Sequence, residues 1–440
     1  MSVTSLHSSL PRRGYRFGLF VAAAMLPGWA QAQSITTRSF DTTIPFTYDR
    51  GRNIGVLERD RSDFEPIGIA VGGFTAFPSI TVSGGYTDNA YQASTDTVGS
   101  AIVKVVPRLE MRSDWSTNSL SFDAQGNFAR YTKLPSRNEN GWSTGAQGRF
   151  DITADQSLSV AARTSRIFET PFSGTGVPTV RGALPVQTSL FSALADFKLS
   201  RTRFALSADH SIINFMSAET FAGTRLNRDN FDRTVTRVTG HAEYGITPGT
   251  GIFLQSTYTD TGYRLPLATG IANRDSREIK VQAGVSFDLA TLLRGSFAIG
   301  YVDRDYDAAR FSDIAGLSID GKVEYFPSEL TTVTMVFRRH IEDASFSTSG
   351  GFILTGGSAR IDHELLRNLL LNIGADYEND KYRAFSSKTN LYRIGGGATY
   401  LANPMMRIVW DASYRHRSAN SAIGPEVTEF RSTVGITFSR

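Results

Sequence analysis

Apolar and polar residues alternate along most of the chain from about Pro78 onward. Between Ser119 and Phe128, every second residue is apolar or glycine, and Ser, Asp, Gln and Asn occupy the positions between them. The same alternation returns at 278–289, 317–325, 369–378, 406–415 and in the last residues of the chain. Because successive side chains of a strand point to opposite faces, each segment predicts a β-strand with one apolar face and one wet face.

The connections between these segments fall into two classes. Short connections with turn residues lie at 153–156, 200–202, 247–250, 326–329 and 401–404. Longer polar connections lie near 171–186, 216–231, 260–276, 303–314, 341–350, 379–388 and 417–427. Short periplasmic turns and long outer loops are typical of outer-membrane barrels. The sequence therefore predicts an all-β fold, a transmembrane antiparallel up-and-down β-barrel.

Strand direction sets the expected strand number. The C-terminal strand should end in the periplasm, so each short turn should lie on the periplasmic side. Counting backward from Arg440 to the strand that starts near Pro78 gives an even number, about 18, with 16 as the alternative. Residues 67–76 then remain as a short extra pairing segment or an entry into the lumen.

Two soluble all-β folds share the alternation and serve as alternatives. Strands of a β-sandwich are usually shorter, about 5–6 residues, and charged residues on each inner face would disrupt its core. A β-helix would show a fixed repeat period, which this sequence lacks. A hydrated lumen accommodates the inward charges, so the pattern favours the membrane barrel.

The N-terminus carries an export signal. Arg12, Arg13 and Arg16 precede an apolar run from Phe17 to Leu26, and Ala30-Gln31-Ala32 forms a small-residue cleavage site. We expect a signal peptide over 1–32, cleaved near Ala32, and a mature protein in the bacterial outer membrane. Residues 33–66 are dense in charge without a strand or helix period, which predicts a poorly structured periplasmic or lumenal segment before a barrel over 67–440.

The alternation also assigns side chains to the two faces of the wall. Aromatic residues near the strand ends are expected to form the two interfacial girdles of a membrane barrel: Tyr86, Trp115, Tyr131, Trp142, Tyr301, Tyr377, Tyr400, Tyr414 and Phe438. Charged residues on the wet face are expected to line the lumen: Arg108, Arg149, Arg163, Arg237, Glu243, Lys280, Lys322, Glu324, Arg360, Asp376, Arg393, Arg407, Asp411 and Arg415. Such charges can set pore selectivity, but they can also pair across strands, and we favour pairing for any single residue. Their near balance argues against a strongly selective pore.

Composition removes several function classes. The chain has no Cys, which excludes disulfides, zinc–thiolate sites and cysteine nucleophiles. A net charge of +4 over 440 residues gives no reason to expect nucleic acid. His residues are scattered, no G-x-S-x-G elbow stands in a strand-turn-helix context, and His363-Glu364 lacks the second His of a zinc-binding helix. We therefore expect no catalytic residues, no metal and no cofactor, and an outer-membrane hydrolase is the least favoured alternative.

The start of the barrel resembles a known family. Residues 66–74 and 78–89, followed by Val106-Pro107-Arg108-Leu109 and Arg112-Ser113-Asp114-Trp115, are similar to the "putative β-barrel porin 2" family. The resemblance would cover roughly 58–440. It implies an outer-membrane barrel often associated with exopolysaccharide or capsule production and export, and it supplies no catalytic residues.

These observations lead to two functional hypotheses. The first is a passive pore or export conduit for small polar solutes or exopolysaccharide. The second is an accessory or structural barrel that supports polysaccharide assembly, with a lumen closed by residues 33–66 or by an inward-folded loop. Expected partners are outer-membrane lipid and lipopolysaccharide, the barrel assembly machinery and polysaccharide export components. The oligomeric state, monomer or trimer, stays open at this stage.

Overall fold

The computed structural model describes residues 51–440, except for 170–171, 173–179, 290–291, 345–348, 384–386 and 419–423. The predicted signal peptide and residues 33–50 lie outside the described residues. Among the helices within the described ranges, none has the length and apolar character needed to cross a membrane.

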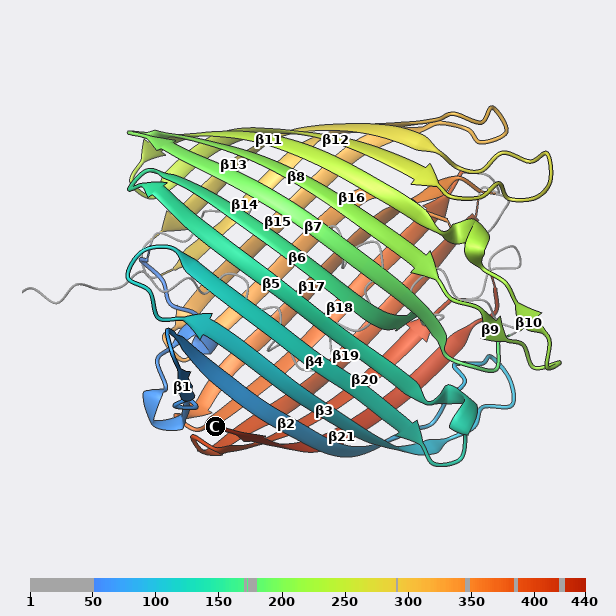
Figure 1. The fold of residues 1–440 in the computed structure, drawn as a ribbon, viewed down its shortest axis with the longest axis horizontal. Helices are drawn as coiled ribbons and strands as arrows, with labels where there is room; N and C mark the ends of the chain where they lie inside the picture. Colours follow the sequence, from blue (N-terminus) through green and yellow to red (C-terminus); the bar gives the residue numbers. More distant parts are fainter. Residues whose placement is uncertain are drawn as a thin grey trace, which may run out of the picture.

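A closed antiparallel β-barrel of 18 strands forms the body of the molecule (Figure 1). Its strands are β2 (Phe74–Thr87), β3 (Ser100–Ser113), β4 (Ser119–Tyr131), β5 (Glu139–Thr153), β6 (Gln156–Glu169), β7 (Leu184–Leu199), β8 (Thr202–Phe215), β11 (Arg233–Thr247), β12 (Thr250–Tyr263), β13 (Ser276–Leu289), β14 (Leu293–Tyr306), β15 (Ile314–Ser328), β16 (Thr331–Asp343), β17 (Gly351–Leu366), β18 (Leu369–Tyr382), β19 (Ser387–Asn403), β20 (Met406–Arg417) and β21 (Val427–Ser439). The predicted fold class and the larger of the two predicted strand numbers are confirmed.

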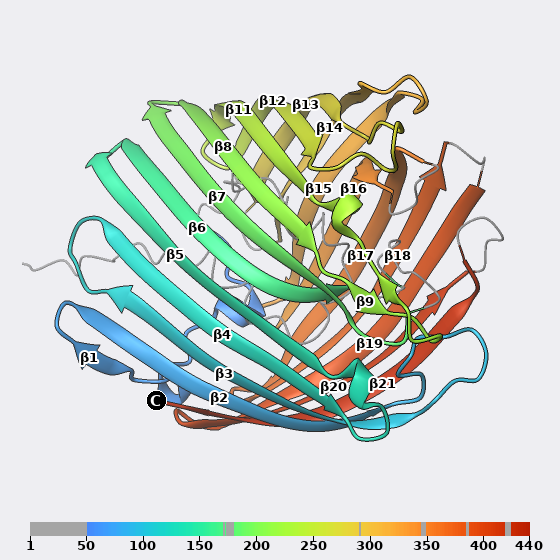
Figure 2. The ribbon, with the colours of Figure 1, turned by 45° about the vertical axis from the view of Figure 1, so that its right-hand side comes forward.

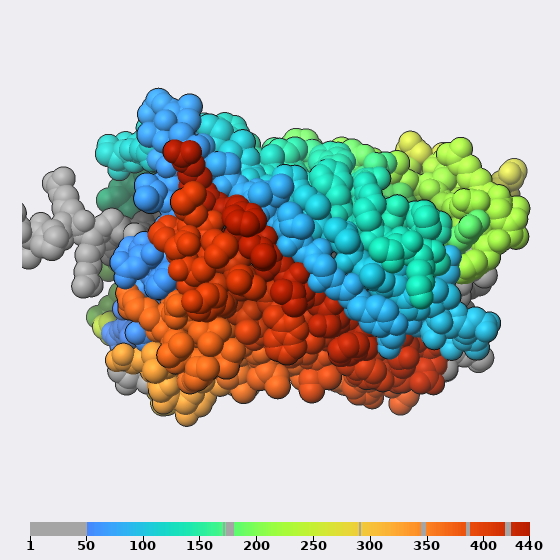
Figure 3. Space-filling model, turned by 90° about the horizontal axis from the view of Figure 1, so that it is seen from below, coloured from blue at the N-terminus to red at the C-terminus, as the bar shows by residue number. Residues whose placement is uncertain are grey.

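The barrel closes where its first and last strands meet. β2 pairs with β21 from Ser79 opposite Ser439 to Thr87 opposite Arg431. Figure 3 shows the first barrel strands, in blue, beside the last strand, in red, on the outer surface. Since each strand of the wall has a hydrogen-bonded neighbour on both sides, the wall has no open sheet edge to expose to lipid.

The first strand begins earlier than the sequence pattern suggested. β2 starts at Phe74 rather than near Pro78, and its first residues also pair with a short strand, β1 (Ile69–Val71). β1 takes the place beside β2 that β21 leaves empty beyond Ser439. The leftover stretch 67–76 therefore supplies both an extra pairing segment and the start of the first barrel strand.

The two faces of the wall follow the alternation in the sequence. In β12, Ile252, Leu254 and Tyr258 are exposed on the outside, while Gln255 and Thr257 are buried on the inside. Lipid solvates the apolar face, and the polar face needs partners inside the barrel. The polarity of neighbouring residues therefore decides which way each strand faces.

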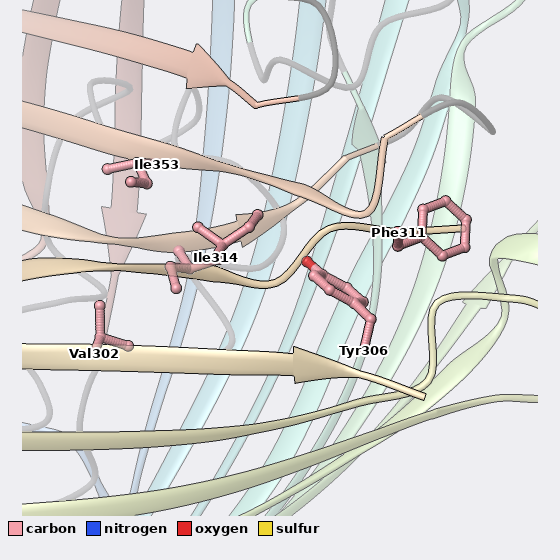
Figure 4. Packing of buried hydrophobic residues seen from close by; sticks show 6 residues of the cluster. Val302, Tyr306, Phe311, Ile314 and Ile353 are labelled. Atoms are coloured by element: carbon pink, nitrogen blue, oxygen red, sulfur yellow. The ribbon is translucent and has the colours of Figure 1, made fainter. Parts of the chain in front are cut away.

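The long connections gather at one end of the barrel (Figure 2). Side chains at this end pack into small hydrophobic clusters. These connections contain η5 (Pro135–Arg137), β9 (Ala218–Glu219), β10 (Arg225–Leu226) and η7 (Asp229–Phe231). One cluster is formed by Val302, Tyr306, Phe311, Ile314, Ile341 and Ile353 at the ends of β14 to β17 (Figure 4). Burial of apolar side chains of this kind fixes the rim of the barrel.

Candidate functional site

The inner wall carries every charged residue that the alternation assigned to the lumen. In β13, for example, Lys280 lies between Ile279 and Val281, which are exposed on the outer surface. The same parity places the other predicted residues inside: Arg108, Arg149, Arg163, Arg237, Glu243, Lys322, Glu324, Arg360, Asp376, Arg393, Arg407, Asp411 and Arg415. The lumen is therefore lined by charge of both signs.

Most of these charges have a partner of opposite sign. Arg163 Nη2 lies 2.6 Å from Asp123 Oδ1, across from β6 to β4. Lys280 Nζ donates to Asp320 Oδ2 at 3.0 Å. Further pairs are Arg108–Glu110 at 3.0 Å, Arg149–Asp151 at 2.8 Å, Lys322–Glu324 at 3.0 Å, Arg360–Asp362 at 2.6 Å and Arg393–Asp376 at 3.8 Å. Cross-strand and same-strand pairing keeps the wet wall close to electrically neutral.

The remaining predicted lumen residues lie beside different kinds of neighbours on the inner wall. Arg237 is in register with Asp209 of β8, and Glu243 accepts a hydrogen bond from Ser286 Oγ. Arg415 is buried, and its guanidinium carbon lies 5.8 Å from the ring centre of Phe172. Arg407 and Asp411 lie on the same face of β20. Thus the wall also contains charged side chains that contact hydroxyl groups or an aromatic ring.

The predicted aromatic girdles are exposed on the outer surface, with one exception. Tyr86, Trp115, Trp142, Tyr301, Tyr377, Tyr400, Tyr414 and Phe438 are all exposed there. Tyr131 is only 3% exposed and packs against Ile102, Ala129 and Leu134. The assignment of Tyr131 to a girdle was wrong, because the alternation of β4 places it on the same inner face as Asp123.

At the short-turn end, residues 51–66 lie against the inner wall. This segment contains η3 (Val56–Glu58) and η4 (Ser62–Phe64). Asn53 Nδ2 donates to Asp288 Oδ1 at 2.6 Å and to the carbonyl of Leu289 at 2.9 Å. The backbone N–H of Val56 donates to Thr332 Oγ1 at 2.9 Å, and Val56 is fully buried. The segment is therefore seated on the ends of β13 and β16.

Ion pairs hold the same segment. Arg294 of β14 contacts Glu58 at 2.7 Å and Glu324 at 2.5 Å. Arg61 Nη2 donates to Glu364 Oε2 of β17 at 2.5 Å, with both side chains 7% exposed. The charge density of 33–66 indicated a periplasmic or lumenal position for this segment. The charge density could not identify the wall residues that bind the segment, because they lie more than two hundred positions away in the chain.

The long-loop end of the barrel contains a cluster of buried arginine and aromatic side chains that the alternation did not reveal. Arg228 pairs with Glu169 at 2.6 Å, and its guanidinium carbon lies 4.9 Å from the ring centre of Phe215. Arg274 lies 4.9 Å from the ring centre of Tyr263 in the same way. Both arginines are fully buried although they fall in predicted loops. The repeated tripeptide Asn-Arg-Asp, at 227–229 and 273–275, is the signal that could have identified them.

Across the described residues, no group of three or more His, Asp and Glu side chains is arranged to hold a metal ion. The arrangement that remains is a polar, ion-paired wall inside a closed barrel, with a seated segment at one end and packed loops at the other. Its chemistry is that of a hydrated lumen.

Comparison with solved structures finds outer-membrane proteins of Pseudomonas. The chain is 13% identical to OpdK from Pseudomonas aeruginosa, covering 83% of this chain and 99% of that chain with a TM-score of 0.44. It is 12% identical to a BenF-like porin from Pseudomonas fluorescens Pf-5, with coverages of 83% and 99% and a TM-score of 0.44. It is 9% identical to OccK2 (OpdF) from Pseudomonas aeruginosa, covering 83% of this chain and 97% of that chain with a TM-score of 0.45. At these identities the likeness concerns the fold alone.

No curated protein matches the chain at a significant level. A family model does match it, over residues 61–440, and this match spans the seated segment from Arg61 and the whole barrel. The family is described as "Putative beta-barrel porin 2". The match agrees with the resemblance carried by the first strands of the barrel. The chain is a porin-like outer-membrane β-barrel that belongs to this family.

Proposed function

We propose that this protein is a passive conduit for polar solutes or exopolysaccharide across the outer membrane, without a catalytic step. The observation that carries the proposal is the polar inner wall, on which charges such as Lys280 and Asp320 neutralise each other. A balanced, hydrated wall gives a polar solute hydrogen-bonding partners without trapping it at one strong charge. The family resemblance supports polysaccharide as one class of cargo.

The seated segment 51–66 favours a second candidate, an accessory barrel whose lumen is closed at the periplasmic end. Asn53, Val56, Glu58 and Arg61 all contact the wall there. In the conduit hypothesis the segment narrows the mouth, whereas in the accessory hypothesis it blocks the mouth. The two hypotheses therefore differ in the conductance of the intact protein.

Planar-bilayer recording of purified, folded protein separates the two hypotheses. We expect stepwise conductance from the intact mature chain and larger steps after deletion of residues 51–66. Conductance only after the deletion would support the closed accessory barrel. An absence of channel activity from both proteins, with the β-sheet content of both intact, would contradict the conduit.

A further inference from the structure

Arg407 differs from the other charged residues of the inner wall. It lies near the short-turn end of β20 and is partly exposed toward the lumen. Among the described residues it forms neither a salt bridge nor a hydrogen bond through its side chain. The carboxylate next along the inner face of the same strand, Asp411, interacts electrostatically with Arg360 and Lys104 instead. Arg407 therefore presents an uncompensated guanidinium to the lumen.

The charged side chain that acts on Arg407 has the same sign. Arg108 of β3 lies close enough for electrostatic repulsion with Arg407. Arg108 contacts Glu110 at 3.0 Å, and Glu110 also contacts Arg112 at 2.5 Å. Glu110 therefore contacts both Arg108 and Arg112, and Arg407 adds a further positive charge beside Arg108. Like charges held together in this way are stabilised by an anion placed between them.

Hydroxyl groups lie on the wall between Arg407 and Arg108. Arg407 is opposite Thr437 of β21, and Thr437 is opposite Thr81 of β2. The hydroxyls of Thr81 and Thr437 are 2.8 Å apart. Arg108 is opposite Ser79. Ser79 is the inward-facing residue of β2 that directly precedes Thr81 on the same face. The closing seam of the barrel therefore carries a row of hydroxyls flanked by two guanidinium groups.

We propose that Arg407, Arg108, Thr81 and Thr437 form a lumenal binding site for a carboxylate group of a passing solute. A guanidinium donates two parallel hydrogen bonds to a carboxylate, and the threonine hydroxyls can donate to its remaining lone pairs. The site rests on the proposed conduit function and names its solute class: acidic polar molecules such as uronic acids. Partial exposure of Arg407 lets the ligand exchange with the lumen.

The test is isothermal titration calorimetry on the full mature protein in detergent, because this measurement does not depend on conductance. The probes are galacturonate and galactose, which differ in a carboxylate against a hydroxymethyl group, together with inorganic phosphate. We expect galacturonate to bind and galactose not to bind. Arg407→Gln should weaken galacturonate binding by about tenfold or more, since charge-assisted hydrogen bonds are lost.

Arg360→Gln is the matched control, because Arg360 is also an inward arginine but is held by Asp362 at 2.6 Å. We expect this variant to bind galacturonate like the wild type, and Arg407→Lys to retain weaker binding because it keeps charge but loses the planar fork. Unchanged binding by Arg407→Gln, equal binding of galactose, or tighter binding of phosphate than of galacturonate would each overturn the proposal. Binding without conductance would refute the conduit and leave the carboxylate site intact.

Discussion

The guanidinium of Arg294 joins the N-terminal segment to the barrel wall, with Nη2 2.7 Å from Glu58 Oε1 and Nε 2.5 Å from Glu324 Oε2. The side chain of Arg294 is buried, whereas the side chain of Glu58 is 49% exposed. Glu324 on the wall is therefore the buried partner of Arg294, and Glu58 is the partner whose substitution disturbs the barrel least.

We predict that Glu58→Gln weakens the docking of residues 51–66 by about 1 kcal/mol, because a half-exposed ion pair contributes little more than that. The expected readout is faster protease cleavage of the segment, with the barrel itself resistant. Asp63→Asn is the matched control, because Asp63 is exposed in the same segment and contacts no wall residue through its carboxylate among the described residues. Equal cleavage of the two variants would contradict the role of Glu58.

Glu364 is expected to matter more than Glu58. The side chains of Arg61 and Glu364 are both 7% exposed, so Glu364→Gln leaves a buried guanidinium without its carboxylate. We predict a loss of about 3 kcal/mol in docking free energy. A double-mutant cycle with Arg61→Gln, read by the same cleavage assay, should show that the two substitutions are strongly non-additive. Additive effects would show that the ion pair does not hold the segment.

The buried pair Arg228–Glu169 supports the outer rim. Glu169→Gln should lower the melting temperature or speed proteolysis of the connection between β8 and β11, since Arg228 then remains charged and buried. The double substitution Glu169→Gln with Arg228→Met should recover most of that loss, because Phe215 and Phe231 flank the guanidinium and can pack on an apolar side chain. Failure of the double variant to recover would mean that the charge itself organises the rim.

Gly300 lies where two strands approach closely. A Cβ atom at this position would lie 1.9 Å from the carbonyl oxygen of Val281 on the neighbouring strand. Gly300→Val should therefore lower the free energy of unfolding by about 1–3 kcal/mol, measured by denaturant titration in detergent. Gly240→Val is the control, because a Cβ there meets no atom within 4 Å. Similar losses in both variants would indicate a general effect of valine on the strands.

Ion selectivity follows from the pairing of lumenal charges. Pairs such as Lys280–Asp320 and Arg163–Asp123 neutralise the wall locally. We predict a reversal potential near zero under a KCl gradient and a permeability ratio near unity. Lys280→Gln should move the reversal potential toward cation preference, because it leaves Asp320 with less positive charge nearby. A strongly anion- or cation-selective wild-type channel would contradict this account.

The alternation of apolar and polar residues was enough to predict the fold and the direction of most side chains. Strict alternation in segments such as 278–289 leaves one way to place each strand in a membrane, since a shift by one residue would put charges into lipid. The same parity assigned Lys280 and Arg407 to the lumen and would have assigned Tyr131 there as well. Tyr131 was assigned to the aromatic girdle because it lies near a strand end. This criterion is weaker than the alternation, and it placed Tyr131 on the wrong face of the wall.

Contacts between distant residues could not be predicted from the alternation and are visible only in the folded barrel. Arg61 and Glu364 are brought together by the docking of the N-terminal segment on the inner wall, and their contact has no local sequence pattern to predict it. Arg407 and Arg108 come from opposite ends of the chain and become neighbours because β21 pairs with β2. Local periodicity encodes the face on which a side chain lies, whereas the distant residue that it meets depends on strand number, register and the path of the connections, which are set by the whole barrel.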